Sequence, residues 1–347
     1  APLTLALCEN KECELLQLRH TIPQELMYRN YWYKSSINPI IVADLKDIIV
    51  SVLKQKTDKG IWIDIGANDG TLLSFAPVGF TRIGVEPAEN LQTELSQNCD
   101  EIFCGLWENF TSPNKAEVIT AIGMLYDSED PNAFISNVKR HLAKDGIFIV
   151  QMMTLEPMFD NNDIGNICHE HLEYYNYKSL VKLFEQNGLE IFKVEKNNIN
   201  GGSYRCFSRH YENGSVKELL EPLYIYDNFF ERVEKNKKET VNFIKQKVSE
   251  GKKVYCYGAS TKGNSILQYY GLNYEFITAI AEKNFEKWGK YTVGTHIPII
   301  SEEEARKKAD YFWIMPWGFL DYFIKREKEW RQKGGKFIVS TPHFKII

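Results

Sequence analysis

Apolar residues between positions 39 and 212 follow two alternating spacings. Short apolar runs predict strands, and segments with an apolar residue every three or four positions predict helices. The expected strands are 60–65, 82–85, 101–104, 117–121, 146–152, 190–195 and 202–210, and the expected helices are 39–56, 70–75, 90–98, 132–142 and 177–187. This order predicts a doubly wound, mainly parallel sheet whose last two strands form an antiparallel hairpin at its edge.

A second α/β pattern follows residues 213–250, which are charged and helix-forming and are expected to be a connector. Its expected strands are 253–257, 276–281, 312–315 and 336–340, and its expected helices follow the loop 258–264 and cover 302–308 and 320–333. Residues 1–45 are expected to form an irregular lead-in. The chain therefore predicts two α/β units after a short lead-in.

Composition narrows the possible partners. The chain has 347 residues and a net charge of −4, with acidic and basic residues mixed along its length, so nucleic acid is not a favoured partner. No apolar run of 18 residues and no signal peptide occur, which favours a cytoplasmic protein without a membrane partner. Seven cysteines, an odd number, suit a reducing compartment. The sequence does not indicate an oligomeric state.

A glycine-containing loop at residues 64–70 follows the first expected strand of the sheet. Gly66 and Gly70 permit a tight turn and the close approach of a ligand. In open α/β sheets, ligands bind beyond the carboxyl ends of the strands. Glu86 closes the next strand, just before Pro87, and an acid at that place accepts hydrogen bonds from ribose hydroxyls.

Two cofactors compete for such a loop. A dinucleotide carries a pyrophosphate, which prefers an uncharged Gly-x-Gly-x-x-Gly loop, whereas this loop carries Asp64 and Asp69. Carboxylates suit a cofactor with a cationic sulfonium and an amino group. The loop resembles the first motif of class I S-adenosylmethionine-dependent methyltransferases, with Glu86 as the second motif; the alternative is a turn that binds nothing.

Two of the seven histidines flank a carboxylate in a loop after the fifth expected strand, in the order Cys168-His169-Glu170-His171. Three interpretations are open. His-x-His with one Glu is a weak metal signal. A structural loop is the second interpretation, and a general base is the third, since histidine titrates near neutral pH.

An ordered series of motifs resembles the sugar C-methyltransferases, which act on nucleotide-linked 4-keto deoxysugars. The series covers nearly the whole chain and comprises 31–36, 64–70, 168–175, 201–205, 257–264, 294–299 and 315–317. The resemblance implies a Rossmann-like class I methyltransferase domain followed by a second Rossmann-like α/β domain. The corresponding ranges are 1–30 for the lead-in, 31–212 for the methyltransferase domain and 213–347 for a domain that helps to hold the nucleotide-sugar.

The resemblance also implies roles for individual residues. His171 would remove the proton from the sugar carbon next to the ketone, and Glu170 would orient His171 or bind a sugar hydroxyl. His169 would contact the substrate or have a structural role. The expected ligands of S-adenosylmethionine are Asp64, Gly66, Asn68, Asp69, Gly70, Glu86 and Pro87, with Tyr33 and Ser36 from the first motif of the series.

This chain departs from the family pattern at two positions that would touch the sugar. Cys168 stands where relatives often carry Tyr, and Asp127 stands where they often carry His after the fourth strand. We therefore expect Cys168 in the catalytic group and Asp127 in the substrate site. The departures also keep open a catalytically inactive sugar-binding protein.

The loop 258–264 of the second unit follows a strand and opens a helix, which is a favourable place for an anion. Lys262 adds a positive charge for a diphosphate, and Asn264 and Trp317 complete the expected substrate contacts. The alternative is an ordinary packed turn.

Cys8 and Cys13 resemble the second half of a zinc module whose first half is not in this chain. Two thiolates do not close a tetrahedral site, so zinc is expected only if a further N-terminal segment supplies the remaining ligands.

The sequence therefore predicts C-methylation of a nucleotide-linked keto-deoxysugar. The alternatives are an O- or N-methyltransferase that acts on a nucleotide-sugar and a nicotinamide-dependent oxidoreductase.

Overall fold

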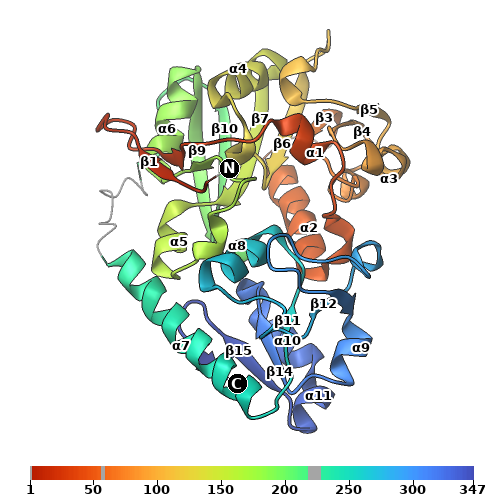
Figure 1. Ribbon diagram of the computed structural model, residues 1–347. Helices are drawn as coiled ribbons and strands as arrows, with labels where there is room; N and C mark the ends of the chain where they lie inside the picture. The colour runs from red at the N-terminus through yellow and green to blue at the C-terminus, as the bar shows by residue number, and fades with distance from the viewer. Residues whose placement is uncertain (1, 56–58, 218–227) are drawn as a thin grey trace. The chain divides into compact units, whose positions relative to one another are not determined.

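The computed structural model describes residues 2–55, 59–217 and 228–347. These residues form two compact units (Figure 1). Unit 1 comprises the described residues of 1–154, 169–199 and 203–223, and unit 2 comprises those of 155–168, 200–202 and 224–347. The second unit is thus built from three separate stretches, two of which interrupt the first unit.

Unit 1 contains a seven-stranded sheet in the order β5-β4-β3-β6-β7-β10-β9. Its strands are β3 Gly60–Ile65, β4 Phe80–Val85, β5 Glu101–Phe103, β6 Ala116–Ile122, β7 Leu142–Met153, β9 Leu189–Asn197 and β10 Ser203–His210. The first five in chain order pair in parallel, and β10 runs antiparallel to both β7 and β9. Counted within the sheet the order is 3-2-1-4-5-7-6, a Rossmann-like methyltransferase fold that confirms the expected sheet and its antiparallel edge.

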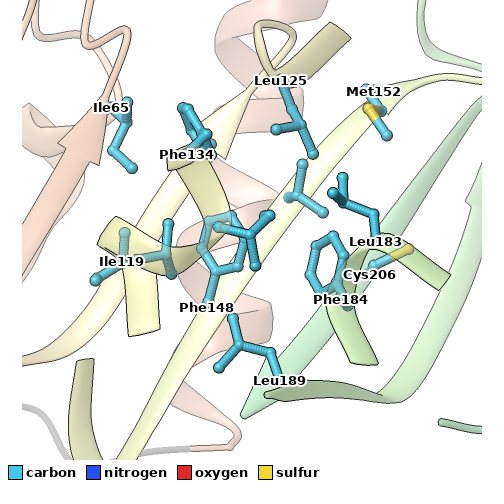
Figure 2. Packing of buried hydrophobic residues seen from close by; sticks show 14 of the residues in the cluster. Ile65, Ile119, Leu125, Phe134, Phe148, Met152, Leu183, Phe184, Leu189 and Cys206 are labelled. Carbon is cyan, nitrogen blue, oxygen red and sulfur yellow. The ribbon is translucent and has the colours of Figure 1, made fainter. Parts of the chain in front are cut away.

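Helices cover both faces of this sheet because its strands alternate between two buried sets. Side chains of α4 Pro131–His141 and α6 Tyr177–Gln186, including Phe134 and Phe184, pack on Ile119, Phe148 and Cys206 (Figure 2). On the opposite face lie α2 Pro39–Leu53 and α3 Gln92–Asn98.

The expected helix at 70–75 is wrong. These residues form turns and a single 3-10 turn, Leu73–Phe75, before the chain extends at Ala76. The Asp69 carboxylate accepts hydrogen bonds from the Thr71 backbone and hydroxyl, which favours a local turn over a regular helix.

The lead-in is not irregular. Strands β1 Leu5–Leu7 and β2 Leu16–Leu18 form a three-stranded sheet with β8 Glu173–Tyr174, and α1 Gln24–Tyr28 follows. Strands of two or three residues are too short to show an alternating pattern, and β8, which pairs with β2, lies more than 150 residues further along the sequence.

Unit 2 has a six-stranded sheet in the order β13-β12-β11-β14-β15-β16. Its strands are β11 Val254–Tyr257, β12 Ile280–Glu282, β13 Ile299–Ser301, β14 Tyr311–Ile314, β15 Lys336–Val339 and β16 Lys345–Ile346, all parallel except β16. Its helices are α5 Leu155–Asp160, α7 Phe229–Ser249, α8 Thr261–Tyr270, α9 Glu302–Arg306, α10 Leu320–Arg326 and α11 Lys328–Gln332. The second Rossmann-like α/β unit is therefore confirmed.

Three details of unit 2 differ from expectation. The expected strand 276–281 begins only at Ile280, since 276 and 277 close a turn on Asn273. The expected helix 320–333 is divided at Glu327 into α10 and α11. Strands β13 and β16 were not expected. Within the described ranges, no helix has both the length and the apolar character needed to cross a bilayer.

Candidate active site

Glu86 and the loop 64–70 form one corner at the carboxyl ends of β3 and β4. Glu86 follows β4 and is 5% exposed. Its Oε2 accepts a hydrogen bond from the Asn68 backbone N–H at 2.8 Å, and its Oε1 accepts one from Ala88 N–H at 2.9 Å. Each oxygen has two lone pairs, so the fixed carboxylate still has acceptor capacity for two ribose hydroxyls. Pro87 lies between Glu86 and Ala88.

Asp64 is buried beside this corner at 4% exposure. Its Oδ1 accepts a hydrogen bond from the Thr120 hydroxyl of β6 at 2.6 Å. Burial, with a smaller contribution from the nearby Glu86 charge, raises the pKa of Asp64 to about 7. Burial also raises the pKa of Glu86. A cationic ligand would relieve both effects, because a positive charge favours the ionised form of each acid.

The segment 33–36 is joined to the glycine loop by side chains of the loop. Asn68 donates to the Tyr33 carbonyl at 3.0 Å and accepts from Ser35 N–H at 2.9 Å, and Asp69 accepts from Ser36 N–H at 3.0 Å. Asn68 has a positive φ of 54°, a conformation that Asn tolerates better than most residues. The structure thus gathers Tyr33 and Ser36 with the expected cofactor residues, although they lie more than 30 positions apart.

Gly66 and Gly70 both have positive φ, at 68° and 77°. A Cβ at Gly70 would lie 2.7 Å from the Cβ of Asn98, so this turn also requires a close approach to α3. These residues therefore fit S-adenosylmethionine. They provide a fixed carboxylate for the ribose, buried acids for the cationic groups and a turn that admits the ligand.

Tyr126 and Asp127 follow β6, which is parallel to β3, so they lie at the same edge of the sheet as the Glu86 corner. His171 packs against Tyr126 and therefore lies at this edge too. The His171 side chain is 8% exposed, and its ring centroid is 4.5 Å from that of Tyr126. The backbone of Leu172 donates to the Tyr126 carbonyl at 2.8 Å and fixes the loop there.

Asp127 and Glu170 lie in the same region. Burial, together with the charges of Glu170 and Glu173, raises the pKa of Asp127 well above its usual range. Its Oδ1 is buried without a hydrogen-bond partner among the described residues. The Tyr31 hydroxyl lies 3.5 Å from Glu170 Oε2. The structure thus brings His171, Glu170 and Asp127 into one polar cluster.

The lead-in helix α1 contributes two residues to this cluster that the sequence did not suggest. The Tyr28 hydroxyl donates to the Glu170 carbonyl at 3.2 Å and is hydrogen-bonded to Asp127, and Gln24 Nε2 donates to the Asp127 carbonyl at 2.7 Å. His169 is partly exposed, and Cys168 is buried. Neither α1 nor its contacts had a sequence signal, because the side chains meet only through tertiary packing. Thr120 was missed for the same reason.

The remaining expected substrate residues lie in unit 2. Lys262 and Trp317 both approach Asp163: the Lys262 charge attracts its carboxylate, and the Trp317 side chain is hydrogen-bonded to it. Asn264 lies in the first turns of α8, and its Oδ1 is buried without a hydrogen-bond partner among the described residues.

Cys8 and Cys13 lie beside each other. Burial raises the pKa of the Cys13 thiol, and the neighbouring Cys8 thiol adds a smaller effect in the same direction. Over the described residues, no group of three or more His, Cys, Asp or Glu side chains is arranged to hold a metal ion. Two thiols alone do not fit a structural zinc site.

Comparison with known proteins agrees with this geometry. A family model described as a methyltransferase domain matches residues 40–194, and one described as a C-methyltransferase C-terminal domain matches residues 198–342. The C-methyltransferase NovU of Streptomyces niveus is 29% identical over 372 residues, which cover 100% of this chain and 87% of the relative.

Solved structures resemble about half of the chain. A methyltransferase from Clostridium acetobutylicum has a TM-score of 0.41 and 15% identity, covering 49% of this chain and 92% of that one. The glycopeptide N-methyltransferase MtfA has a TM-score of 0.41 and 9% identity, covering 52% and 96%. These likenesses are distant, and the assignment depends on the family models and the relative. Its two matched methyltransferase domains and this relative identify the chain as an S-adenosylmethionine-dependent methyltransferase that is similar along its whole length to a C-methyltransferase.

Proposed function

We propose that the protein methylates the carbon next to the ketone of a nucleotide-linked 4-keto deoxysugar, with His171 as the general base. The observation that carries the proposal is the cluster of the buried His171 with the half-buried Asp127 and Glu170 at the same sheet edge as the Glu86 corner. The sugar and the nucleotide named in this proposal are taken from the resemblance to sugar C-methyltransferases.

The chemistry needs a base and a hydrogen-bond donor close together. A C–H bond becomes a carbon nucleophile only after deprotonation, which a neighbouring ketone permits because the charge spreads onto oxygen as an enolate. S-adenosylmethionine, held by Glu86 and the loop 64–70, would supply the electrophilic methyl group, exchanging its S–C bond for the new C–C bond and becoming S-adenosylhomocysteine. His171 would retain the substrate proton until solvent removes it.

Asp127 suits the donor role, and Glu170 suits substrate binding or the orientation of His171. Because its pKa is raised, Asp127 is protonated at a higher pH than an exposed acid and can donate a hydrogen bond to the ketone or enolate oxygen. The position of the substrate carbon relative to the methyl group then matters as much as the acidity of its C–H bond, since the attack is in line. We propose His169 as a further substrate contact.

Solvent exchange tests the proposal. The protein is incubated in D₂O with a nucleotide-linked 4-keto-6-deoxyhexose and without S-adenosylmethionine, and mass spectrometry follows deuterium uptake at the carbon next to the ketone. We expect uptake by the unmodified protein and a rate at least about 10²-fold lower for His171→Asn, because a positioned base contributes about that factor or more.

His210→Asn is the matched control, since His210 lies in the same unit and contacts the Leu142 carbonyl. It should exchange at the unmodified rate. Methyl transfer without any exchange would contradict C-methylation through an enolate, and an unchanged rate in His171→Asn would remove this residue as the base.

A further inference from the structure

Helix α1 reaches the candidate site through Tyr28, a residue to which the proposed function gives no role. The Tyr28 hydroxyl is hydrogen-bonded to Asp127 and lies 3.2 Å from the Glu170 carbonyl oxygen. At the start of the same helix, Gln24 Nε2 donates to the Asp127 carbonyl at 2.7 Å. The helix therefore holds both the backbone and the side chain of Asp127.

The two side-chain oxygens of Asp127 have different surroundings. Oδ1 is buried and has no hydrogen-bond partner among the described residues. The bond to Tyr28 therefore falls on the other oxygen, Oδ2. A buried polar atom without a partner costs free energy, so Oδ1 indicates a place for a polar group of the substrate. Tyr28 thus holds one oxygen of the carboxyl group and leaves the other for the ligand.

The Tyr28 hydroxyl has a single proton, which it shares between the Glu170 carbonyl and Asp127. Its distance of 3.2 Å from the carbonyl exceeds the range of about 2.5–3.0 Å for an O–H···O bond, so this bond is weak. Hydrogen bonds to ionised groups are stronger than those to neutral groups. The proton therefore moves toward Asp127 whenever that carboxyl group gains negative charge.

Titratable side chains from several segments surround Asp127. They are Tyr28 in α1, Tyr31 just after it, Glu170 and His171 in the loop before β8, and Glu173 in β8. Burial raises the pKa of Asp127, and the charges of Glu170 and Glu173 add to this effect. Burial also raises the pKa of Glu173 to about 9. The bond from Tyr28 lowers the pKa of Asp127, because a donor favours the ionised form of a carboxyl group.

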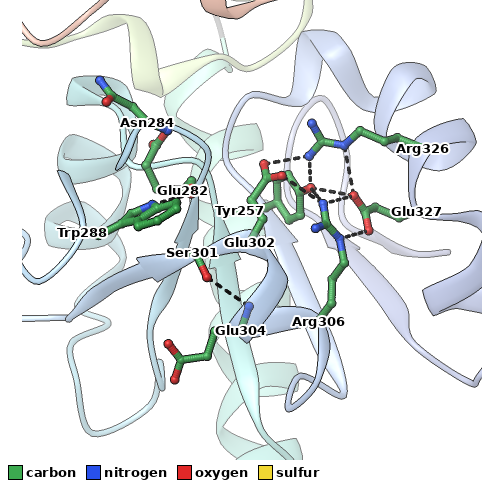
Figure 3. A network of polar contacts seen from close by, with 10 residues as sticks. All are labelled: Tyr257, Glu282, Asn284, Trp288, Ser301, Glu302, Glu304, Arg306, Arg326 and Glu327. Atoms are coloured by element: carbon green, nitrogen blue, oxygen red, sulfur yellow. Dashed lines mark hydrogen bonds and ion pairs between the residues drawn. The ribbon is translucent and has the colours of Figure 1, made fainter. Parts of the chain in front are cut away.

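A tyrosine of unit 2 provides a contrast, because its acidic partner also contacts cations. The Tyr257 hydroxyl donates to Glu327 at 2.7 Å, and Arg306 and Arg326 also bond to this carboxylate (Figure 3). There the two positive charges balance the acid independently of the tyrosine. In unit 1 the acid faces other acids instead, so the tyrosine hydroxyl has the larger influence on its ionisation.

We propose that Tyr28 is a positioning residue that acts through Asp127, holding Oδ2 so that Oδ1 meets the ketone oxygen of the substrate. As the enolate forms, negative charge gathers on this oxygen, and the Asp127 carboxyl group donates to it more strongly. The bond from Tyr28 strengthens this donation, because hydrogen bonds in a chain polarise one another. The substrate part of the inference rests on the proposed function, whereas the coupling of Tyr28 to Asp127 does not.

The coupling is measured on the full chain without substrate. The protein is labelled with aspartate that carries ¹³C in its side-chain carboxyl group, and NMR follows the signal of Asp127 from about pH 4 to pH 10. Its signal is identified by its loss in Asp127→Asn. Tyr28→Phe keeps the ring, whose centroid is 5.7 Å from that of Tyr31, and removes only the hydroxyl. We expect the pKa of Asp127 to rise in this variant. An unchanged or lower pKa would overturn the proposal.

The effect on the reaction is measured by deuterium exchange into a nucleotide-linked 4-keto-6-deoxyhexose. Tyr28→Phe should exchange about tenfold more slowly at saturating substrate, because it loses one hydrogen bond to a group that gains charge. The substrate concentration at half-maximal rate should not change. In the Asp127→Asn background the same substitution should have little further effect, since the carboxyl group is already absent. Equal slowing in both backgrounds would show that Tyr28 does not act through Asp127.

The pH profile of exchange gives a readout that a loss of packing would not move. The rate should fall as the pH rises through the pKa of Asp127, because only the protonated carboxyl group can donate. Tyr28→Phe raises this pKa, so the fall should move to higher pH, and it should be absent in Asp127→Asn. A fall at the same pH in Tyr28→Phe and in the unmodified protein would contradict the inference.

Tyr177→Phe is the matched control. Tyr177 is buried in the same unit, and its hydroxyl donates to the Val216 carbonyl at 2.7 Å. This variant also loses a tyrosine hydroxyl bond, but it should keep the pKa of Asp127 and the exchange rate. Binding of S-adenosylhomocysteine should persist in every variant and shows that the unit is folded. If the unmodified protein exchanges no deuterium, the proposed function fails, and the NMR titration still decides whether Tyr28 is coupled to Asp127.

Discussion

Asp64 gives cofactor binding a pH dependence at the residue scale. Its pKa is raised to about 7 by burial, so a large fraction is neutral at pH 6. A bound cation favours the ionised form, and binding must then release a proton. We expect the affinity for S-adenosylmethionine, which carries both cationic groups, to rise about tenfold from pH 5.5 to pH 7, measured by calorimetry in buffers of matched ionic strength.

Asp64→Asn isolates this effect from the titration of Glu86. The variant should bind like the unmodified protein at pH 5.5, where Asp64 is already neutral, and more weakly at pH 7. If both proteins gain affinity in parallel, another group is responsible and Asp64 does not face the cationic part of the cofactor.

Single residues also show where prediction from the sequence succeeds and where it stops. Asp64 and Glu86 were placed at neighbouring strand ends, because strand ends are visible as the edges of apolar runs. The sequence could not show that Asn68 and Asp69 hold the backbone of 33–36, or that Thr120 holds Asp64. Such pairings depend on which strands become neighbours.

At the scale of elements, a buried ion pair joins β10 to α2. Arg205 donates to Asp44 at 2.9 Å, to Asp47 at 2.7 Å and to Gln151 at 2.7 Å. Arg205 and Asp44 are both almost completely buried. Arg205→Met should lower the free energy of unfolding by about 3–5 kcal/mol, measured by urea denaturation, because Asp44 would remain buried without its partner.

The double variant Arg205→Met, Asp44→Leu should recover most of this loss, since no unpaired charge then remains. Arg82→Met is the control, because Arg82 and Asp100 form a partly exposed pair whose loss costs about 0–1 kcal/mol. A loss equal to that of the control would show that the buried pair does not join the two elements energetically.

Elements with a strong internal period were predicted well, and those defined by their partners were not. Strand β3 and helices α4 and α6 match their expected ranges closely, because each buries one regular face. Strands β1, β2 and β8 have two or three residues each, too few to show alternation. The lead-in therefore looked irregular although α1 contributes to the candidate site.

At the scale of the molecule, chain order and spatial units do not coincide. The sequence predicts that the methyltransferase domain ends at residue 212 and that the C-terminal domain begins at residue 213. Residues 155–168, however, group with unit 2. Asn162 donates to the Pro342 carbonyl at 2.9 Å and accepts from Arg232 at 2.7 Å, and the rings of Phe159 and Phe229 are 4.5 Å apart.

This grouping predicts that the fragment 228–347 is incomplete by itself. Without residues 155–168 it loses two hydrogen bonds of Asn162 and the packing of Phe159, which together contribute about 3–5 kcal/mol. We expect the fragment to unfold at a lower urea concentration than unit 2 of the full chain, followed by the fluorescence of its tryptophans. A synthetic peptide of residues 155–168 should raise the midpoint, whereas the same peptide with Asn162→Ala and Phe159→Ala should not. A fragment that unfolds cooperatively at the full-chain midpoint without the peptide would show that the segment contributes no stability to this unit, because a segment that completes a core must stabilise it.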